Sequence, residues 1–100
     1  MAQFKCYVCN DEVRTGEKFT FTKKGSVHFD CFVSAKRKGI KPEKAEMLRT
    51  LSLILDSELS HLLNLLRINP VDEMSKEYER IKYKDIEKAA GETTKKIDEL

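Results

Sequence analysis

The 100 residues, of which 40 % are hydrophobic and 36 % charged, suit one compact domain or a small domain with an appendage. No apolar run reaches the roughly 18 residues of a membrane-spanning helix, and the N-terminus lacks the apolar stretch of a signal peptide, so we expect a cytoplasmic protein without membrane contact. The net charge of +2 combines +5 over residues 1–41 (nine Lys/Arg, four Asp/Glu) with −3 over residues 42–100 (ten against thirteen), which predicts two parts with different roles.

The first part contains every cysteine and every phenylalanine of the chain. Residues 19–22, Phe-Thr-Phe-Thr, alternate between apolar and polar side chains, as is typical of a strand with one buried face. With Lys24-Gly25 as a turn, this pattern predicts a β-hairpin over residues 17–29. A short helix is expected to follow over residues 31–38, with Asp30 as its N-cap.

The second part predicts two long helices. From Pro42 to residue 68, leucines and other apolar residues recur at steps of three and four, as on one face of an amphipathic helix. Asn69 then suits the N-cap of a second helix that runs to the C-terminus, in which Gly91 is a weak point. Residues 42–100 are therefore expected to form a long antiparallel helical hairpin.

The three cysteines and one histidine form the pattern Cys6-x2-Cys9-x18-His28-x2-Cys31, two pairs of equal spacing. Thiolate and imidazole are the ligands that a tetrahedral structural zinc site uses, and the predicted hairpin closes the loop between the two pairs. The pattern predicts one Zn²⁺ per chain, held by these four residues. The expected fold class is then α+β and mostly α: a zinc-stapled β-hairpin with a short helix, residues 1–41, followed by the helical hairpin.

Three other interpretations of the cysteines compete with zinc. Cys6 and Cys9 have the spacing of a redox pair, which would make the chain a thiol redox or metal-handling protein, although no βαβ pattern surrounds them. A disulfide framework is disfavoured by the odd number of cysteines and the expected cytoplasmic location. The cysteines and His28 could also be unrelated buried residues, but the doubled spacing argues against chance.

The four ligand positions, with a hairpin between the pairs and a helix after the second, resemble the first zinc-binding half of a LIM domain, or more broadly a treble-clef finger. Residues 42–100 contain no cysteine, so only one such half is present. Together with the stretches 16–21 and 27–31, the ligand pairs also resemble a group of small archaeal proteins with no assigned function. This resemblance implies a zinc finger in an archaeal cytoplasm and supplies no substrate.

Nothing in the sequence indicates catalysis. Four protein ligands leave a zinc ion no open position for water or substrate, and three thiolates with one neutral imidazole give the site a net charge of −1. His61, the other histidine, has no partner at ligand spacing, and the chain has no nucleophile-elbow or phosphate-loop pattern. We therefore expect a binding protein and not an enzyme.

Two kinds of partner fit the sequence. The basic first part could follow nucleic-acid phosphates, and the residues that would do so are Lys23, Lys24, Lys36, Arg37, Lys38 and Lys41. The broad leucine face of the second part could instead meet a second copy in a homodimer, or another protein; its residues are Leu48, Leu51, Leu55, Leu59, Leu62 and Leu66. We expect a protein–protein interaction module first and a nucleic-acid-binding zinc protein second.

Overall fold

The computed structural model describes residues 4–100 as two small antiparallel hairpins followed by three α-helices. This mostly helical α+β architecture confirms the predicted fold class. The first three residues of the predicted 1–41 module lie outside the described residues. The elements in chain order are β1 (Phe4–Lys5), β2 (Glu12–Val13), β3 (Phe19–Thr22), β4 (Gly25–His28), α1 (Phe29–Gly39), the 3₁₀ turn η1 (Pro42–Lys44), α2 (Ala45–Ile68) and α3 (Glu73–Asp98).

The predicted hairpin is present as β3 and β4, paired from Phe19 opposite His28 to Thr22 opposite Gly25. The turn itself lies one residue earlier than predicted, at Lys23-Lys24. Gly25 is the first residue of β4 and has a φ of 120°, a backbone conformation that other residues rarely adopt. A second, shorter hairpin of β1 and β2 precedes it, and the sequence analysis did not predict that one.

Helix α1 begins two residues before the predicted start, because His28 and not Asp30 occupies the N-cap position. No side chain caps this end, and Asp30 instead lies in the first turn, where a carboxylate favours the positive end of the helix dipole. The early start has a consequence for the metal centre. Cys31 lies inside the first turn of α1, one residue after Asp30, and His28 stands at the junction between strand and helix.

The two long helices confirm the predicted helical hairpin, with corrections at their ends. Asn69 does not cap the second helix: with a φ of 50°, it ends α2 in the left-handed conformation that asparagine tolerates. The N-cap of α3 is Asp72, whose side chain accepts a hydrogen bond of 2.7 Å from the backbone N–H of Ser75. Gly91 does not interrupt α3, which continues to Asp98.

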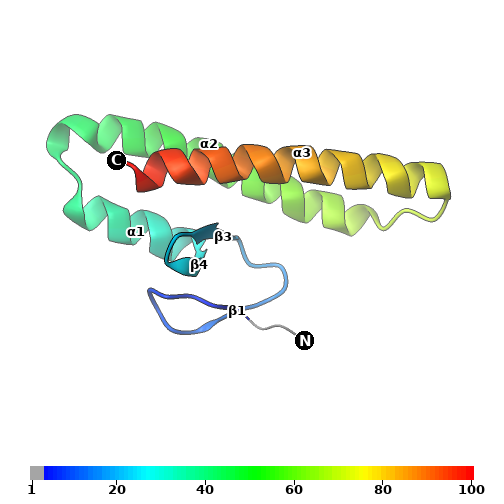
Figure 1. Cartoon of the computed structure of the whole chain (residues 1–100), viewed down its shortest axis with the longest axis horizontal. Coiled ribbons are helices and arrows are strands. Elements are labelled where there is room, and N and C mark those ends of the chain that lie inside the picture. Colours follow the sequence, from blue (N-terminus) through cyan, green and yellow to red (C-terminus); the bar gives the residue numbers. More distant parts are fainter. Residues whose placement is uncertain (1–3) are drawn as a thin grey trace.

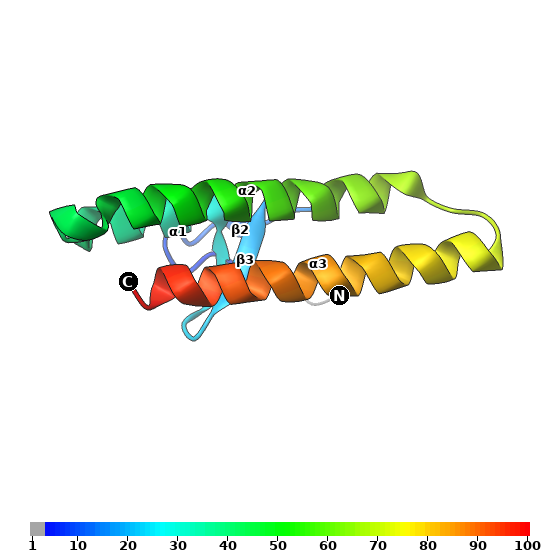
Figure 2. The same ribbon diagram turned by 90° about the horizontal axis from the view of Figure 1, so that it is seen from above.

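The helices α2 and α3 run antiparallel, side by side, and form one layer of an elongated molecule of 50 × 28 × 18 Å (Figures 1 and 2). The β-hairpins and α1 lie together on one face of this layer and cover only the half that holds the start of α2 and the end of α3 (Figure 1). The other half, which includes the α2–α3 connection, extends beyond the N-terminal unit. No helix among residues 4–100 is long and apolar enough to cross a membrane.

One hydrophobic core joins the N-terminal unit to the helical layer. Its fully buried side chains are Cys6 and Val27 from the N-terminal unit, Leu55 from α2 and Ile97 from α3. A buried hydrogen bond of 2.7 Å between the Thr20 hydroxyl on β3 and the Thr94 hydroxyl on α3 adds a polar contact to this junction. The hairpin is thus fixed on α3 by both apolar packing and one satisfied polar pair.

We expect Thr20→Val and Thr94→Val each to lower the free energy of unfolding by about 1–2 kcal/mol, because each leaves one buried hydroxyl without its partner. The double variant should lose less than the sum of the two, since it removes both hydroxyls. Urea unfolding of the metal-loaded protein measures all three values. Thr50→Val on the exposed surface of α2 is the control, with an expected change within about 0.5 kcal/mol. Strict additivity of the two changes would show that the pair does not interact.

Candidate metal centre

The four predicted ligands converge on one point in the N-terminal unit. Cys6 follows β1, Cys9 lies in the turn between β1 and β2, His28 ends β4, and Cys31 lies in the first turn of α1. One ligand atom from each of the four residues lies within 4.8 Å of the other three. The structure therefore brings together a potential metal-binding site from two chain segments that are 19 or more residues apart.

The distances between the ligand atoms fit tetrahedral coordination of an ion of the size of Zn²⁺. Metal–sulfur bonds of about 2.3 Å and metal–nitrogen bonds of about 2.0–2.1 Å place sulfur and nitrogen about 3.6 Å apart in a tetrahedron. The Nδ1 atom of His28 lies 3.4 Å from the Sγ atom of Cys9 and 3.9 Å from that of Cys31. The types of ligand atom and the distances between them thus suit a closed site with four protein ligands.

The backbone around Cys6 and Cys9 turns tightly so that both sulfurs face the same point. Asn10 donates its backbone N–H to the Cys6 carbonyl at 2.8 Å and adopts a left-handed φ of 67°, which asparagine tolerates. The backbone N–H of His28 lies 3.4 Å from the Cys6 sulfur and donates to it. Such N–H groups stabilise a thiolate, so the peptide backbone contributes to the site as well as the side chains.

The thiols of Cys6 and Cys31 hold their protons very differently. Burial favours the protonated form of Cys6, but backbone N–H groups of Cys9, His28 and Val8 outweigh it and lower the Cys6 pKa to about 6. Burial raises the pKa of Cys31 to about 12, and the thiols of Cys6 and Cys9 act in the same direction. Because a metal binds the thiolate form, binding must displace the proton of Cys31, and metal uptake should release protons.

One residue of this site, Glu17, was not predicted from the sequence. Its carboxylate lies 3.2 Å from Nε2 of His28 and also accepts a hydrogen bond of 2.6 Å from the backbone N–H of Arg14. A carboxylate on the second ring nitrogen fixes the histidine tautomer and leaves Nδ1 free to bind a metal. The observed register pairs Phe19 with His28, so Glu17, two residues earlier, is a diagonal neighbour of His28. The predicted turn at Lys24-Gly25 would instead pair His28 with Phe21, and this shift of register hid the role of Glu17.

The basic residues considered for nucleic-acid binding come from two separate places. Lys23 and Lys24 form the β3–β4 turn, whereas the others lie in the last turn of α1 and the linker after it: Lys36, Arg37, Lys38 and Lys41. Lys36 donates a hydrogen bond of 2.9 Å to the carbonyl of Asp98 at the end of α3. The Lys24 ammonium lies 6.0 Å from the centre of the Tyr7 ring.

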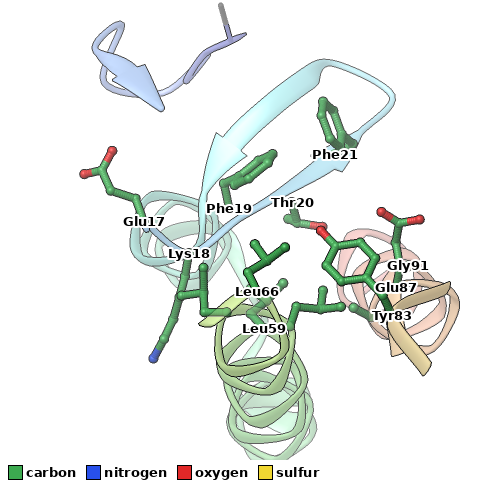
Figure 3. A pocket seen from close by; sticks show the side chains of 13 residues that line it. Glu17, Lys18, Phe19, Thr20, Phe21, Leu59, Leu66, Tyr83, Glu87 and Gly91 are labelled. Carbon is green, nitrogen blue, oxygen red and sulfur yellow. The ribbon is translucent and has the colours of Figure 1, made fainter. Parts of the chain in front are cut away.

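The leucines considered for an interface divide into two groups. Leu48, Leu51, Leu55 and Leu59 are buried in the core of the chain itself, whereas Leu62 is half-buried and Leu66 is 56 % exposed. Leu59, Leu62 and Leu66 line an apolar groove of about 230 Å³ between β3 and the two long helices. Figure 3 shows Phe19, Leu66 and Tyr83 around this groove, with Glu17 pointing away from it.

The fold and the site define a mostly helical α+β protein with a potential metal-binding cluster of three cysteines and one histidine. The chain belongs to the family described as "uncharacterized protein conserved in archaea (DUF2175)", whose profile matches residues 2–99. Comparisons with curated proteins and with solved structures found no match. The family match agrees with the archaeal resemblance seen in the sequence and covers both the N-terminal unit and the helical hairpin.

Replacing Glu17 should weaken metal binding without removing a ligand. We expect Glu17→Ala to reduce the affinity for Co²⁺ or Zn²⁺ about 10- to 100-fold, because His28 loses the carboxylate that orients its ring. Competition with a chromophoric chelator measures the change, and the visible spectrum of bound Co²⁺ reports whether the ligand set is intact. Glu12→Ala, at an exposed position on β2, is the matched control and should bind like the parent. If Glu17→Ala bound the metal as tightly as Glu12→Ala, Glu17 would have no role in metal binding.

Proposed function

We propose that this chain is a protein–protein interaction module, not an enzyme, whose N-terminal unit is held in shape by one structural Zn²⁺ ion. The observation that carries the proposal is the convergence of Cys6, Cys9, His28 and Cys31 on a single point. Four protein ligands leave no coordination position for a substrate, so an ion there would stabilise the fold and would not act as a Lewis acid. The treble-clef likeness of the ligand pairs supports zinc as the ion.

Zinc suits this site better than other common metals. A set of three thiolates and one imidazole favours Zn²⁺ in tetrahedral geometry, and it disfavours Mg²⁺ and Ca²⁺, which take oxygen ligands. Iron also binds thiolates but usually with four cysteines. The three cysteines are free of disulfides, which suits a reducing compartment such as the cytoplasm. The proposed ion would contribute about 10–16 kcal/mol in such a site, comparable to the whole stability of a typical domain.

The interaction role rests on the shape of the molecule. The long helices extend well beyond the N-terminal unit (Figure 1), and large apolar side chains are exposed along them. Contiguous apolar surface of this kind usually marks a protein–protein interface. We propose that the helical hairpin mediates self-association into a homodimer, with a further protein as the alternative partner.

Nucleic-acid binding remains the second proposal, and the charge of +5 over residues 1–41 is its support. A salt series decides between the two. A protein that neutralises several phosphates loses affinity for an oligonucleotide log-linearly as salt rises. If retention on an oligonucleotide column is weak and does not follow this law, the nucleic-acid proposal is wrong.

Native mass spectrometry of the purified protein tests metal and assembly in one spectrum. We expect one Zn²⁺ per chain and a dimer as the main species. A monomer with one Zn²⁺ would support the metal centre but contradict self-association. A metal-free chain that was never exposed to chelator would contradict the metal centre and reopen the redox interpretation of Cys6 and Cys9.

Removing the metal should affect the two parts of the molecule unequally. We expect a strong chelator to abolish amide protection in β1–β4 and α1, because the ligands are the cross-links between these short elements. Loss of the N-terminal unit would uncover the buried leucines of α2, so binding of a hydrophobic dye should rise. Hydrogen exchange followed by mass spectrometry, with and without chelator, maps the change. Uniform protection in both states would mean that no metal holds this unit.

A further inference from the structure

The face of the α2–α3 layer that lies opposite the N-terminal unit carries a row of exposed, mostly apolar side chains, which we call the outer seam. No other element of residues 4–100 covers this face (Figures 1 and 2). Seven of its residues are large and apolar, with exposed fractions from 45 % to 89 %. The outer seam consists of Met47, Ile54, His61 and Ile68 on α2, Val71 in the connection, and Met74, Tyr78 and Ile81 on α3.

Helical geometry places these residues away from the N-terminal unit. Successive residues of an α-helix are about 100° apart, so Tyr83 and Glu87 turn to one side of α3, and Tyr78 and Lys82 turn to the other. The first pair lines the groove shared with β3 (Figure 3). The second pair lines a different groove, together with Leu65 and Ile68 of α2, to which no strand contributes.

The spacing in the outer seam is that of a helix-packing interface. The α2 residues of the seam recur every seven positions, and those on α3 alternate steps of three and four. This is the repeat that aligns knobs and holes between neighbouring helices in coiled coils and four-helix bundles. A helical hairpin with such a row on its open face has the arrangement of one half of a four-helix bundle.

The exposed area of the outer seam favours a second copy of the same chain, and its small net charge permits one. With about 200 Å² for a free residue of this size, the seven apolar residues expose roughly 900 Å², close to the approximately 800 Å² that each partner contributes to a standard interface. Residues 47–81, which span the outer seam, carry four Lys/Arg and six Asp/Glu, a net charge of −2. In a two-fold dimer each patch meets its own copy, and so small a net charge adds little self-repulsion. The seam carries no strong net charge that would attract a partner of opposite charge.

We propose that two copies of this chain pair through their outer seams, so that two helical hairpins form a four-helix bundle with the N-terminal units on its outside. The proposal rests on the self-association proposed above and assigns its surface. It places the interface on the opposite face from Leu66 and from the groove beside β3. The core leucines stay inside each protomer, and the metal centre lies away from the interface.

Charge substitutions in the seam test this assignment. We expect Met74→Glu and Tyr78→Glu each to raise the dimer dissociation constant at least about 100-fold. Each substitution is present in both protomers, so the two-fold interface would bury two new carboxylates. Both positions are more than half exposed in the single chain, so the protomer should keep its fold. Sedimentation equilibrium over a concentration series measures dimerisation, while zinc content and circular dichroism verify folding.

Two matched variants make the result specific to one face. Leu53→Glu adds the same charge at another position of α2 that is 56 % exposed but lies off the seam, and its dimer should match the parent. Leu66→Glu places the charge beside the groove near β3, at a residue of equal exposure, and should also leave the dimer intact. Dissociation by Leu66→Glu but not by Met74→Glu would overturn the outer seam and move the interface to the groove. A parent protein that is monomeric throughout the series would instead contradict the proposed self-association itself.

A fluorescent reporter gives a positive signal from the same surface. The chain contains no tryptophan, so Tyr78→Trp introduces a single indole at a position that is 63 % exposed in the protomer. Its emission should move to shorter wavelength as the protein concentration rises through the dimer dissociation constant. Leu53→Trp, the off-seam control, should not shift. An unshifted Tyr78→Trp emission in a sample that sedimentation shows to be dimeric would overturn the assignment.

Discussion

Two chain segments converge on Cys6, Cys9, His28 and Cys31, and the metal ion proposed there is the constraint on which we expect the N-terminal unit to depend. Strands of two and four residues cannot bury enough apolar surface to be stable alone. A metal bound by the two pairs would fix the β1–β2 turn against the junction of β4 and α1. Once this junction is fixed, Val27 and Phe32 point into the same core as Leu55. The unit can then cover half of the helical layer, which would otherwise expose its leucines.

The unequal size of the two parts explains why the molecule has both a covered and a bare region. Helices of 24 and 26 residues extend about 36–39 Å, whereas the N-terminal unit spans only part of that length. Near the start of α2, the apolar face packs inside the chain. Further along, beside Ile68 and Met74, the same helices keep apolar side chains in solvent. The length of the helices thus explains the bare end of the layer, whereas Met47 and Ile54, nearer the start of α2, are exposed because they lie on the side of the helix away from the core.

The sequence predicted what depends on spacing and period, and it failed where competing local geometries decide. The cluster of Cys6, Cys9, His28 and Cys31, the β3–β4 hairpin and the two long helices were found because paired spacing, alternation and helical steps are local signals. The ends were harder to predict. Asparagine is suited both to the N-cap of a helix and to a left-handed residue at a helix C-terminus, so the sequence alone does not decide the role of Asn69. In the structure Asp72 accepts the Ser75 N–H and is the N-cap of α3, and Asn69 ends α2. Glu17 was missed because its role requires the strand register that places it beside His28.

The leucine face illustrates a further limit, since helical period identifies an apolar face but not what covers it. Leu48 and Leu55 have the same spacing as an interface would, yet the N-terminal unit and α3 cover them. Once they are assigned to the core, the remaining apolar residues are those that intramolecular packing leaves out. Core and outer seam therefore occupy different sides of the same two helices, so stability and association can be separated. Substitutions such as Met74→Glu therefore test the proposed association alone, whereas changes at the proposed metal ligands test the fold.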